Sequence, residues 1–219
     1  MDLDILTESL AKAFDAFKNN IVAYVVAALI TTIVCVLSVF ILPLIFLAPL
    51  SYGLTYMAVK GARGETVEIG DLFFACRSLP RFIRSWLYFI VILALIIVIA
   101  IVFGILAVAL GMIHEMLVVL AGLIAAVLAF VCIVGMIYSD TLYIMTPPSG
   151  VIEVLKRSLT LSKENIGLTI VATIVMMILN MIGSSFVILS LLTMPFSLLF
   201  LVYMVKGLAP SVRDTSDDI

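Results

Sequence analysis

The stretch SWLYFIVILALIIVIAIVFGILAVALGMI, residues 85–113, decides the class of fold because it contains no charged side chain. It starts directly after Arg84, and a second uncharged stretch, residues 116–139, follows His114 and Glu115. A helix crosses the hydrocarbon core of a bilayer with about 20 apolar residues, so each stretch is long enough for one crossing. The two stretches therefore predict a pair of transmembrane helices joined by a short external turn at His114 and Glu115.

Two further uncharged regions flank this pair. Residues 19–59 and 165–205 are each about twice as long as one crossing requires. Pro43 and Pro49 interrupt the first region, where a helix must kink or break. We therefore expect one helix over residues 21–42 and a shorter return helix over 44–59, which leaves open whether this pair crosses fully. The turn in the second region is marked by Asn180, Gly183, Ser184 and Ser185.

The overall composition agrees with a membrane protein. Hydrophobic residues make up 65% of the 219 and charged residues 12%, against about a quarter charged residues in a soluble domain. The net charge of −2 gives no reason to expect a nucleic-acid partner. Because acidic residues precede the first apolar run, we expect no cleavable signal peptide.

The cationic side chains indicate the orientation of the chain. The twelve Lys and Arg residues form four groups, namely Lys12 and Lys18; Lys60, Arg63, Arg77, Arg81 and Arg84; Lys156, Arg157 and Lys163; Lys206 and Arg213. If each intervening stretch crosses the membrane an even number of times, all four groups face one side, which the positive-inside rule makes the cytoplasm. Placing one such side chain at mid-bilayer costs about 2.5–3.5 kcal/mol. We expect a prokaryotic cytoplasmic membrane protein with both termini inside.

An amphipathic cytoplasmic segment precedes each predicted pair. Residues 3–21 carry apolar side chains at steps of three and four, the second segment begins with Asp71 as its N-cap, and the third is capped by Ser149. The apolar stripe of the third segment is expected at Ile152, Leu155 and Leu159. These faces either lie on the membrane interface or pack on the bundle, and both can hold together. The side chains predicted to contact anionic lipid headgroups are Lys12, Lys18, Arg63, Arg77, Arg81, Arg84, Lys156, Arg157 and Lys163.

The first and last pairs resemble one another and suggest an internal repeat. KNNI (18–21) matches KENI (163–166), PLS (49–51) matches PFS (195–197), and KG (60–61) matches KG (206–207). Both copies enter from the cytoplasm, so the repeats would be parallel, about an axis along the membrane normal. The single membrane domain then divides into residues 1–61, a middle pair with longer helices (62–148), 149–207 and a polar tail (208–219).

A family resemblance rests on the two cytoplasmic loops. KGARGE (60–65) followed by IGDLF (69–73), and YSD (138–140) followed by VLKRS (154–158) and KEN (163–165), resemble the loops of YciC-like and DUF975/DUF4013-like prokaryotic membrane proteins. The membrane domain of some glycerophosphodiester phosphodiesterases belongs to the same group. The resemblance implies a six-helix membrane domain with no settled activity, and the phosphodiesterase barrel is absent.

The residues needed for catalysis are scarce. His114 is the only histidine, and it lacks the second histidine of an HExxH metal motif. No nucleophile elbow and no phosphate-binding glycine loop occurs. We therefore expect no catalytic residue, no metal site and no cofactor, and a hydrolase would require His114 to meet a nucleophile from another helix.

Four polar residues in or near the spans are candidates for a site. Asp140 is the acid closest to the membrane interior, and an ionisable residue there is a functional candidate. We expect it to end its helix at the headgroups and to pair with Lys156 or Arg157. Ser51 and Ser197 each follow a proline by two residues, where a hydroxyl satisfies disrupted backbone bonds or lines a midplane site. The candidates are Asp140, Ser51, Ser197 and Asn180.

These observations lead to one functional expectation and one alternative. We expect a non-enzymatic polytopic membrane protein that contacts anionic lipid on its cytoplasmic side as a scaffold or accessory protein, with a partner protein as a further candidate. The alternative is a transporter or channel for a small or amphipathic solute, with a cavity between the first and third pairs lined by Ser51, Ser197 and neighbouring tyrosines.

Overall fold

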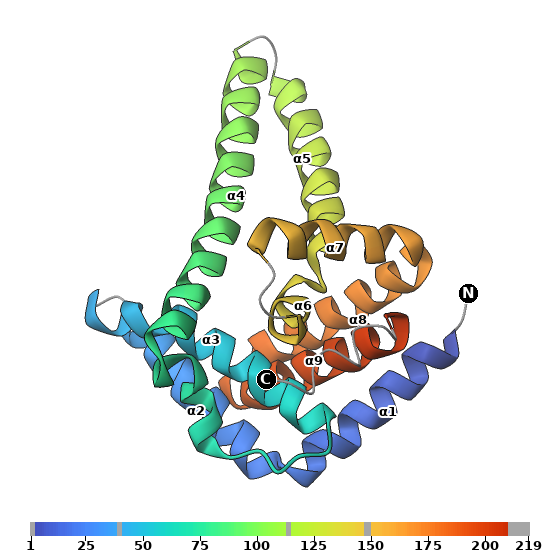
Figure 1. Ribbon diagram of the computed structural model, residues 1–219. Coiled ribbons are helices and arrows are strands. Elements are labelled where there is room, and N and C mark those ends of the chain that lie inside the picture. Colours follow the sequence, from blue (N-terminus) through green and yellow to red (C-terminus); the bar gives the residue numbers. More distant parts are fainter. Residues whose placement is uncertain (1–2, 39–40, 113–114, 147–149, 210–219) are drawn as a thin grey trace.

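The protein is helical throughout the part of the chain that the structure, a computed structural model, describes: residues 3–38, 41–112, 115–146 and 150–209 (Figure 1). No strand occurs in these ranges, which confirms the predicted all-helical class. The elements are α1 (Leu3–Asn19), α2 (Ile21–Leu37), α3 (Ile41–Ala62), the 3-10 helix η1 (Ile69–Arg77), α4 (Leu79–Gly111), α5 (Glu115–Met136), α6 (Ser139–Met145), α7 (Val151–Glu164), α8 (Ile166–Ser185) and α9 (Val187–Leu208).

Several helices are long and apolar enough to cross a membrane, so the chain is a multi-pass membrane protein. In the described residues five stretches qualify: Leu44–Ala62, Leu79–Leu110, Val119–Met145, Ile166–Ser185 and Ile188–Leu208. The predicted span over residues 21–42 corresponds to α2, which has only 17 residues. Helix α2 meets α1 at a bend of 88°. It qualifies only when α1 and α2 are taken together as a broken pair.

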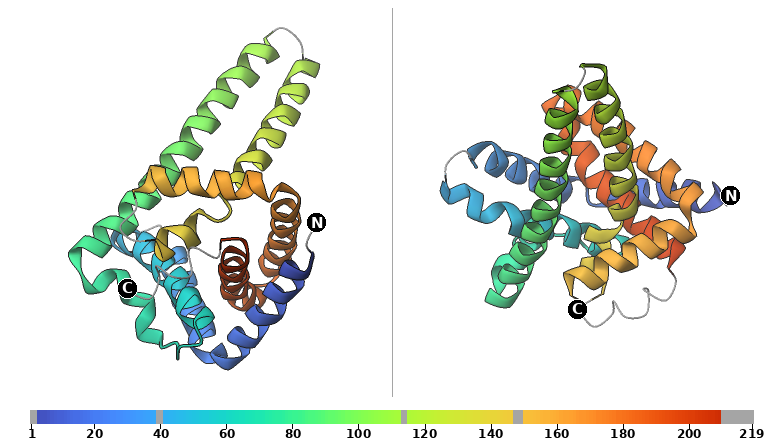
Figure 2. Two further views of the ribbon diagram at one scale, coloured as in Figure 1. Left: turned by 45° about the vertical axis from the view of Figure 1, so that its right-hand side comes forward. Right: turned by 90° about the horizontal axis from the view of Figure 1, so that it is seen from above.

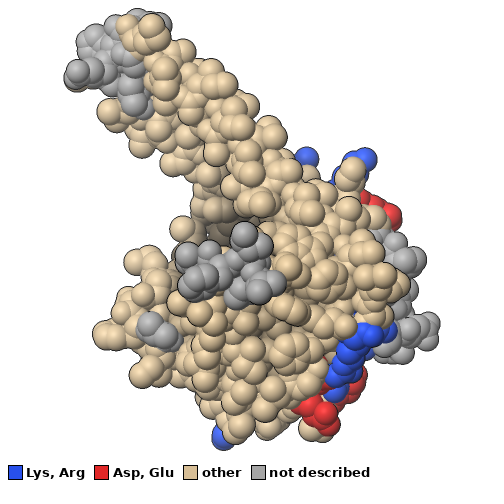
Figure 3. Space-filling model, turned by 90° about the vertical axis from the view of Figure 1, so that its left-hand side faces the viewer, with Lys and Arg blue, Asp and Glu red and all other residues tan. Residues whose placement is uncertain are grey.

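The pair α4–α5 projects from a body formed by the other helices (Figures 1 and 2). Large apolar side chains on both helices are exposed, such as Ile105 at 66% and Val127 at 62%. On the face drawn in Figure 3 the described surface of the projecting part of this pair carries no charge, and the charged residues lie at its base and on the body. A contiguous apolar surface along two whole helices is rare on soluble monomers. It is compatible with contact between these helices and the hydrocarbon core of a membrane.

The hydrophobic core lies in the body, where α2, α3, α6 and α9 meet. Tyr24, Met57, Leu142 and Phe200 are fully buried there. The hydroxyl of Tyr24 donates a hydrogen bond of 3.1 Å to the carbonyl of Met57. A Cβ on Gly61 would lie 2.1 Å from that hydroxyl, so a residue without a side chain is required for α2 and α3 to approach this closely.

Two predicted element boundaries around the second predicted cytoplasmic segment were wrong. Helix α4 begins at Leu79 rather than at Ser85, because proline is tolerated in the first turn of a helix, where Pro80 lies. The N-cap of η1 is Glu68, not Asp71. Asp71 is the third residue of η1, and its carboxylate accepts a 3.0 Å bond from the Glu68 N–H in a capping box.

The third predicted cytoplasmic segment corresponds to α7, and its N-cap differs from the prediction. The N-cap of α7 is Gly150, and the predicted cap Ser149 lies outside the described residues. Of the predicted apolar stripe, Ile152 is 67% exposed and Leu159 40% exposed, so the stripe as a whole does not pack on the bundle, and the alternative of the membrane interface stays a prediction. The buried face instead contains Val151, Val154, Ser158, Leu161 and Ser162.

Two serines explain the rotation of α7. Helix α5 ends at Met136, so the carbonyls of its last turn lack partners within the helix. Ser158 donates a 2.9 Å hydrogen bond to the carbonyl of Gly135, and Ser162 donates a 3.0 Å bond to that of Val134. These polar residues therefore face inward and fix α7 across the base of α5.

Candidate functional site

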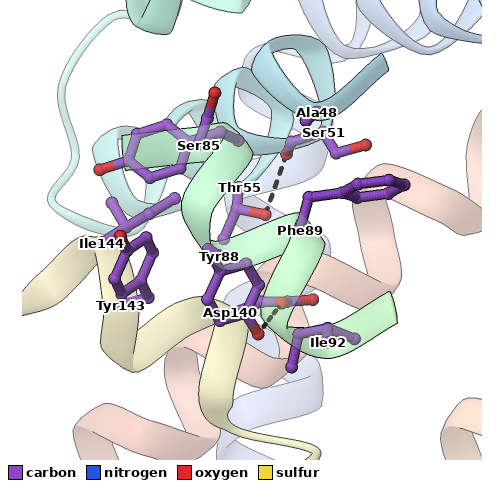
Figure 4. Close-up of a pocket in the computed structure, with 11 residues that line it drawn as sticks. Ala48, Ser51, Thr55, Ser85, Tyr88, Phe89, Ile92, Asp140, Tyr143 and Ile144 are labelled. Carbon is purple, nitrogen blue, oxygen red and sulfur yellow. Dashed lines mark hydrogen bonds between the residues drawn. The ribbon is translucent and has the colours of Figure 1, made fainter. Parts of the chain in front are cut away.

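A cavity of about 240 Å³ lies between α3, α4 and α6 (Figure 4). Each helix contributes residues at spacings of three and four, which places them on one helix face. The lining residues are Ala48, Ser51, Tyr52 and Thr55 of α3; Ser85, Tyr88, Phe89 and Ile92 of α4; and Asp140, Tyr143 and Ile144 of α6.

Asp140 supplies the carboxylate of this cavity. The Tyr88 hydroxyl donates a hydrogen bond to Asp140 Oδ1 and lies 2.8 Å from the Ser139 hydroxyl. The predicted pairing of Asp140 with Lys156 or Arg157 is wrong in the described part of the chain, where Asp140 forms no ion pair. The reason is the break between α5 and α6 at residues 137–138, which turns Asp140 toward α4.

Tyr143 is held rigidly at the edge of the cavity. Its hydroxyl donates a 3.0 Å bond to the Arg84 carbonyl, and Arg84 Nη2 donates a 2.9 Å bond to the Tyr143 carbonyl. The Arg84 guanidinium also lies 4.6 Å from the centre of the Tyr143 ring. The ring of Tyr88 stacks on that of Tyr143, with centroids 4.6 Å apart. These contacts connect α4 to α6 and fix the distance across the cavity.

Three hydroxyls of the lining are bonded within their own helices. Ser51 donates to the Leu47 carbonyl at 3.0 Å, Thr55 to the Ser51 carbonyl at 3.2 Å, and Ser85 to the Phe82 carbonyl at 2.7 Å. A hydroxyl has one proton and two lone pairs, so each of these groups retains only acceptor capacity.

The structure brings together two of the four polar candidates. Ser51 and Asp140 line the same cavity, whereas Ser197 and Asn180 are not among its lining residues. Ser197 is buried in α9, and Asn180 donates a 2.9 Å bond to the Met176 carbonyl of its own helix. The transporter alternative had predicted a cavity between the first and third pairs. The cavity at Ser51 instead adjoins α4 of the middle pair, so this part of the alternative is wrong.

Three contributors to the site were missed: Ser85, Tyr88 and Tyr143. The spacing of Ser85 and Tyr88, three residues apart in an apolar run, was a usable signal for a polar helix face. Tyr143 had no such signal, because its position depends on the α5–α6 break. That break falls at Ile137 and Tyr138, and neither is a proline or a glycine that would have indicated it.

The predicted headgroup-contacting cations fall into two sets. Lys18, Lys156, Arg157 and Lys163 are exposed and form no hydrogen bond or ion pair with any described residue. The others are engaged by protein groups, as Arg84 is. Lys12 pairs with Glu8 at 2.5 Å, Arg63 with Glu65 at 3.8 Å and Arg77 with Asp71 at 3.5 Å, and Arg81 lies 4.2 Å from the centre of the Phe74 ring.

Asp71 organises the loop between α3 and α4. Its carboxylate accepts a 2.7 Å bond from Lys60 and a 3.0 Å bond from the Glu68 N–H. Burial of the carboxyl disfavours its ionised form, but these bonds and the charge of Arg77 outweigh burial and lower the pKa of Asp71. The loop is thereby fixed to the end of α3.

Comparisons with known proteins give no further assignment. No protein-family model, no curated protein and no solved structure matches the chain. In the described ranges, no group of three or more His, Cys, Asp or Glu side chains has the arrangement to hold a metal ion. His114 lies outside these ranges, and so does the prediction of an external turn at that residue.

Proposed function

We propose that this protein is a non-enzymatic polytopic protein of a prokaryotic cytoplasmic membrane that contacts anionic lipid headgroups as a scaffold or accessory protein. Its six predicted spans form three pairs, with the cationic groups and both termini on the cytoplasmic side. The family resemblance of the two loops stays a prediction and agrees with this class.

The exposed face of α7 is the observation that carries the proposal. Ile152, Lys156, Leu159 and Lys163 lie at steps of three and four, so they share one helix face, and all four are exposed. Large apolar side chains alternating with lysines are typical of helices that lie in the membrane interface. The lysine stems cover apolar surface while the ammonium groups reach lipid phosphates.

The attachment of α7 supports this location. Ser158 and Ser162 bind it to the last turn of α5. Arg81 and Arg84 lie in the first turns of α4, at the same end of the projecting pair. The described length of α4–α5 beyond these turns carries no Lys or Arg. A membrane around α4–α5 would therefore bring its headgroups to α7.

Two features support the predicted parallel repeat. Asn20 precedes α2 and Asn165 precedes α8, at matching positions of the two copies. Their backbone angles are similar, with φ −128° and ψ 27° at Asn20 and φ −122° and ψ 39° at Asn165. Each side-chain amide donates to the carbonyl four residues earlier, at 3.4 Å and 3.2 Å respectively.

Lipid selectivity of the purified full-length protein tests the proposal. Native mass spectrometry would compare retained phosphatidylglycerol with retained phosphatidylcholine for the natural protein and for a Lys156→Gln, Lys163→Gln variant. About 1 kcal/mol per lysine near an anionic surface corresponds to about a fivefold loss of selectivity for each lysine removed. The Lys156→Arg, Lys163→Arg variant keeps both charges and should retain selectivity. Equal retention of both lipids by the natural protein would contradict the proposal.

The cavity favours a second candidate function, a transporter or channel for a small or amphipathic solute. A volume of about 240 Å³ with one carboxylate and several aromatic rings has the composition of a small-molecule site. Substituting Ser51→Leu would fill part of it without removing a charge. If proteoliposomes show solute flux, this variant should reduce it; unchanged flux would exclude passage through this cavity.

A further inference from the structure

The polar side chains of the α3–α4–α6 cavity are almost all hydrogen-bond acceptors. The protons of Ser51, Thr55 and Ser85 are committed to carbonyls of their own helices. The proton of Tyr143 is committed to the Arg84 carbonyl. Among the described lining residues, the Tyr52 hydroxyl is the remaining donor without a partner. A ligand must therefore supply donors of its own, which an ammonium group does, with three donors and no acceptor.

The charge of the cavity selects the same kind of ligand. Asp140 accepts a bond from Tyr88 on Oδ1, which leaves Oδ2 for a ligand. Arg84 is bound to Tyr143 and forms no ion pair with Asp140 in the described structure. Because the Asp140 side chain is exposed, a ligand can reach it, and its negative charge attracts a cation.

Aromatic rings complete the lining. Tyr52, Tyr88, Phe89 and Tyr143 contribute rings from all three helices. Tyr52 meets Tyr143 edge to face, with centroids 6.0 Å apart and an angle of 89°. Ring faces attract organic cations by about 0.5–2 kcal/mol each, most strongly away from water. An apolar group on the ligand would also pack against Ala48 and Ile92.

The volume limits the size of the ligand. At about 240 Å³ the cavity lies below the range of about 300–1,000 Å³ typical of pockets for drug-sized ligands. It therefore suits a small solute with one ring, and a whole phospholipid is too large for it.

We propose that this cavity binds a small protonated amine with an aromatic or aliphatic group, its ammonium bound to Asp140 Oδ2 and its apolar part between Tyr52, Phe89 and Ile92. The inference rests on the second candidate function and names the solute class. Ser51, Thr55 and Ser85 offer only acceptor capacity to the ligand, and Tyr88 positions the carboxylate from the other side.

Three probes of nearly equal shape test the assignment on the full-length protein in lipid nanodiscs. Benzylamine is cationic, benzyl alcohol is neutral and benzoate is anionic at neutral pH. Isothermal titration calorimetry should show benzylamine binding at least about tenfold more tightly than either of the others. Asp140→Asn keeps an oxygen for the Tyr88 bond and should reduce benzylamine affinity by at least about tenfold. Glu153→Gln removes a carboxylate from the first turn of α7 and should leave affinity unchanged.

The outcomes separate the amine assignment from the function on which it rests. Equal affinity for benzyl alcohol and benzylamine, or full retention of binding by Asp140→Asn, would overturn the amine assignment while leaving a solute site. Absence of binding by all three probes would overturn it as well, and absence of solute flux in addition would remove the second candidate function. Because Asp140→Asn could impair folding, Ser51→Leu is the second variant, and it should also abolish benzylamine binding.

Discussion

Gly53 of α3 lies directly against the backbone of Leu72 in η1, and a Cβ added at Gly53 would be 1.8 Å from the Leu72 carbonyl oxygen. The obstacle is backbone and not the end of a flexible side chain, so η1 would have to move away from α3. Leu72 is fully buried, and Phe74 of the same element stacks on Tyr56 with centroids 3.7 Å apart. The contact therefore fixes the loop between α3 and α4 on the helix that carries Ser51, Tyr52 and Thr55.

Gly53→Ala is expected to destabilise the protein. Overpacking of this kind costs about 1–3 kcal/mol, and the rigid obstacle favours the upper end. The measurement is the free energy of unfolding in detergent, from denaturant titration. Gly104→Ala is the matched control, because a Cβ at Gly104 on α4 meets nothing within 4 Å and alanine is the better helix former. Equal stability of the two variants would contradict the packing described for η1.

Asp71→Asn is expected to loosen the loop and to remove part of the pH dependence of stability. The pKa of Asp71 is lowered in the folded protein, so its contribution to stability is complete above the ordinary value of 3.8 and is lost as the pH falls from there through the lowered pKa. At neutral pH the substitution leaves Lys60 without its carboxylate partner and should cost about 2–4 kcal/mol.

The measurement for Asp71 is the unfolding free energy as a function of pH. The natural protein should lose more stability than Asp71→Asn on acidification below 3.8, the ordinary pKa of the group. Glu65→Gln serves as the control, because Glu65 is exposed and lies 3.8 Å from Arg63, a geometry in which ion pairs contribute about 0–1 kcal/mol. Parallel pH curves for the natural protein and Asp71→Asn would exclude the described role of Asp71.

The spans could be predicted from the sequence because hydrocarbon leaves few alternatives to an uncharged helix. The predicted 85–113 run corresponds to α4, and only its start was misplaced, since neither a proline in the first turn nor the arginines at positions 81 and 84 end a helix. The face of α7 could not be predicted from apolar periodicity, because Ser158 and Ser162 are buried by hydrogen bonds to carbonyls of a distant helix. The sequence of α7 alone does not reveal a contact with a helix that is distant in the chain.

Individual residues of the candidate site could be predicted from the sequence, but the cavity that they share could not. Ser51 and Asp140 were recognisable as polar groups in or near apolar spans. Their shared cavity depends on the α5–α6 break, which turns Asp140 toward Tyr88. The expected pairing with Lys156 or Arg157 does not form, because Asp140 accepts a hydrogen bond from Tyr88 of α4 instead.

Removing the serine bonds should loosen α7 from α5. Ser158→Ala and Ser162→Ala each delete a buried hydrogen bond of about 1 kcal/mol and leave a carbonyl unsatisfied, so the double variant should lose about 2–4 kcal/mol. Hydrogen exchange of residues 151–164 should accelerate in that variant. Thr160→Ala is the control, because Thr160 is exposed and bonds only to the Lys156 carbonyl of its own helix. Unchanged exchange in the double variant would show that other contacts fix α7.

Labelling of single cysteines tests the arrangement in the membrane. In a background with Cys35, Cys76 and Cys132 replaced by alanine, Arg157→Cys and Met112→Cys place thiols near the two ends of the projecting pair, and both positions are exposed. A membrane-impermeant maleimide applied to intact cells should label Met112→Cys but should label Arg157→Cys only after permeabilisation. The physical reason is that cationic groups stay on the cytoplasmic side, while the uncharged end of α4–α5 crosses. Labelling of both thiols in intact cells would place Lys156 and Lys163 outside, and the lipid contact proposed for α7 would then fall on the wrong leaflet.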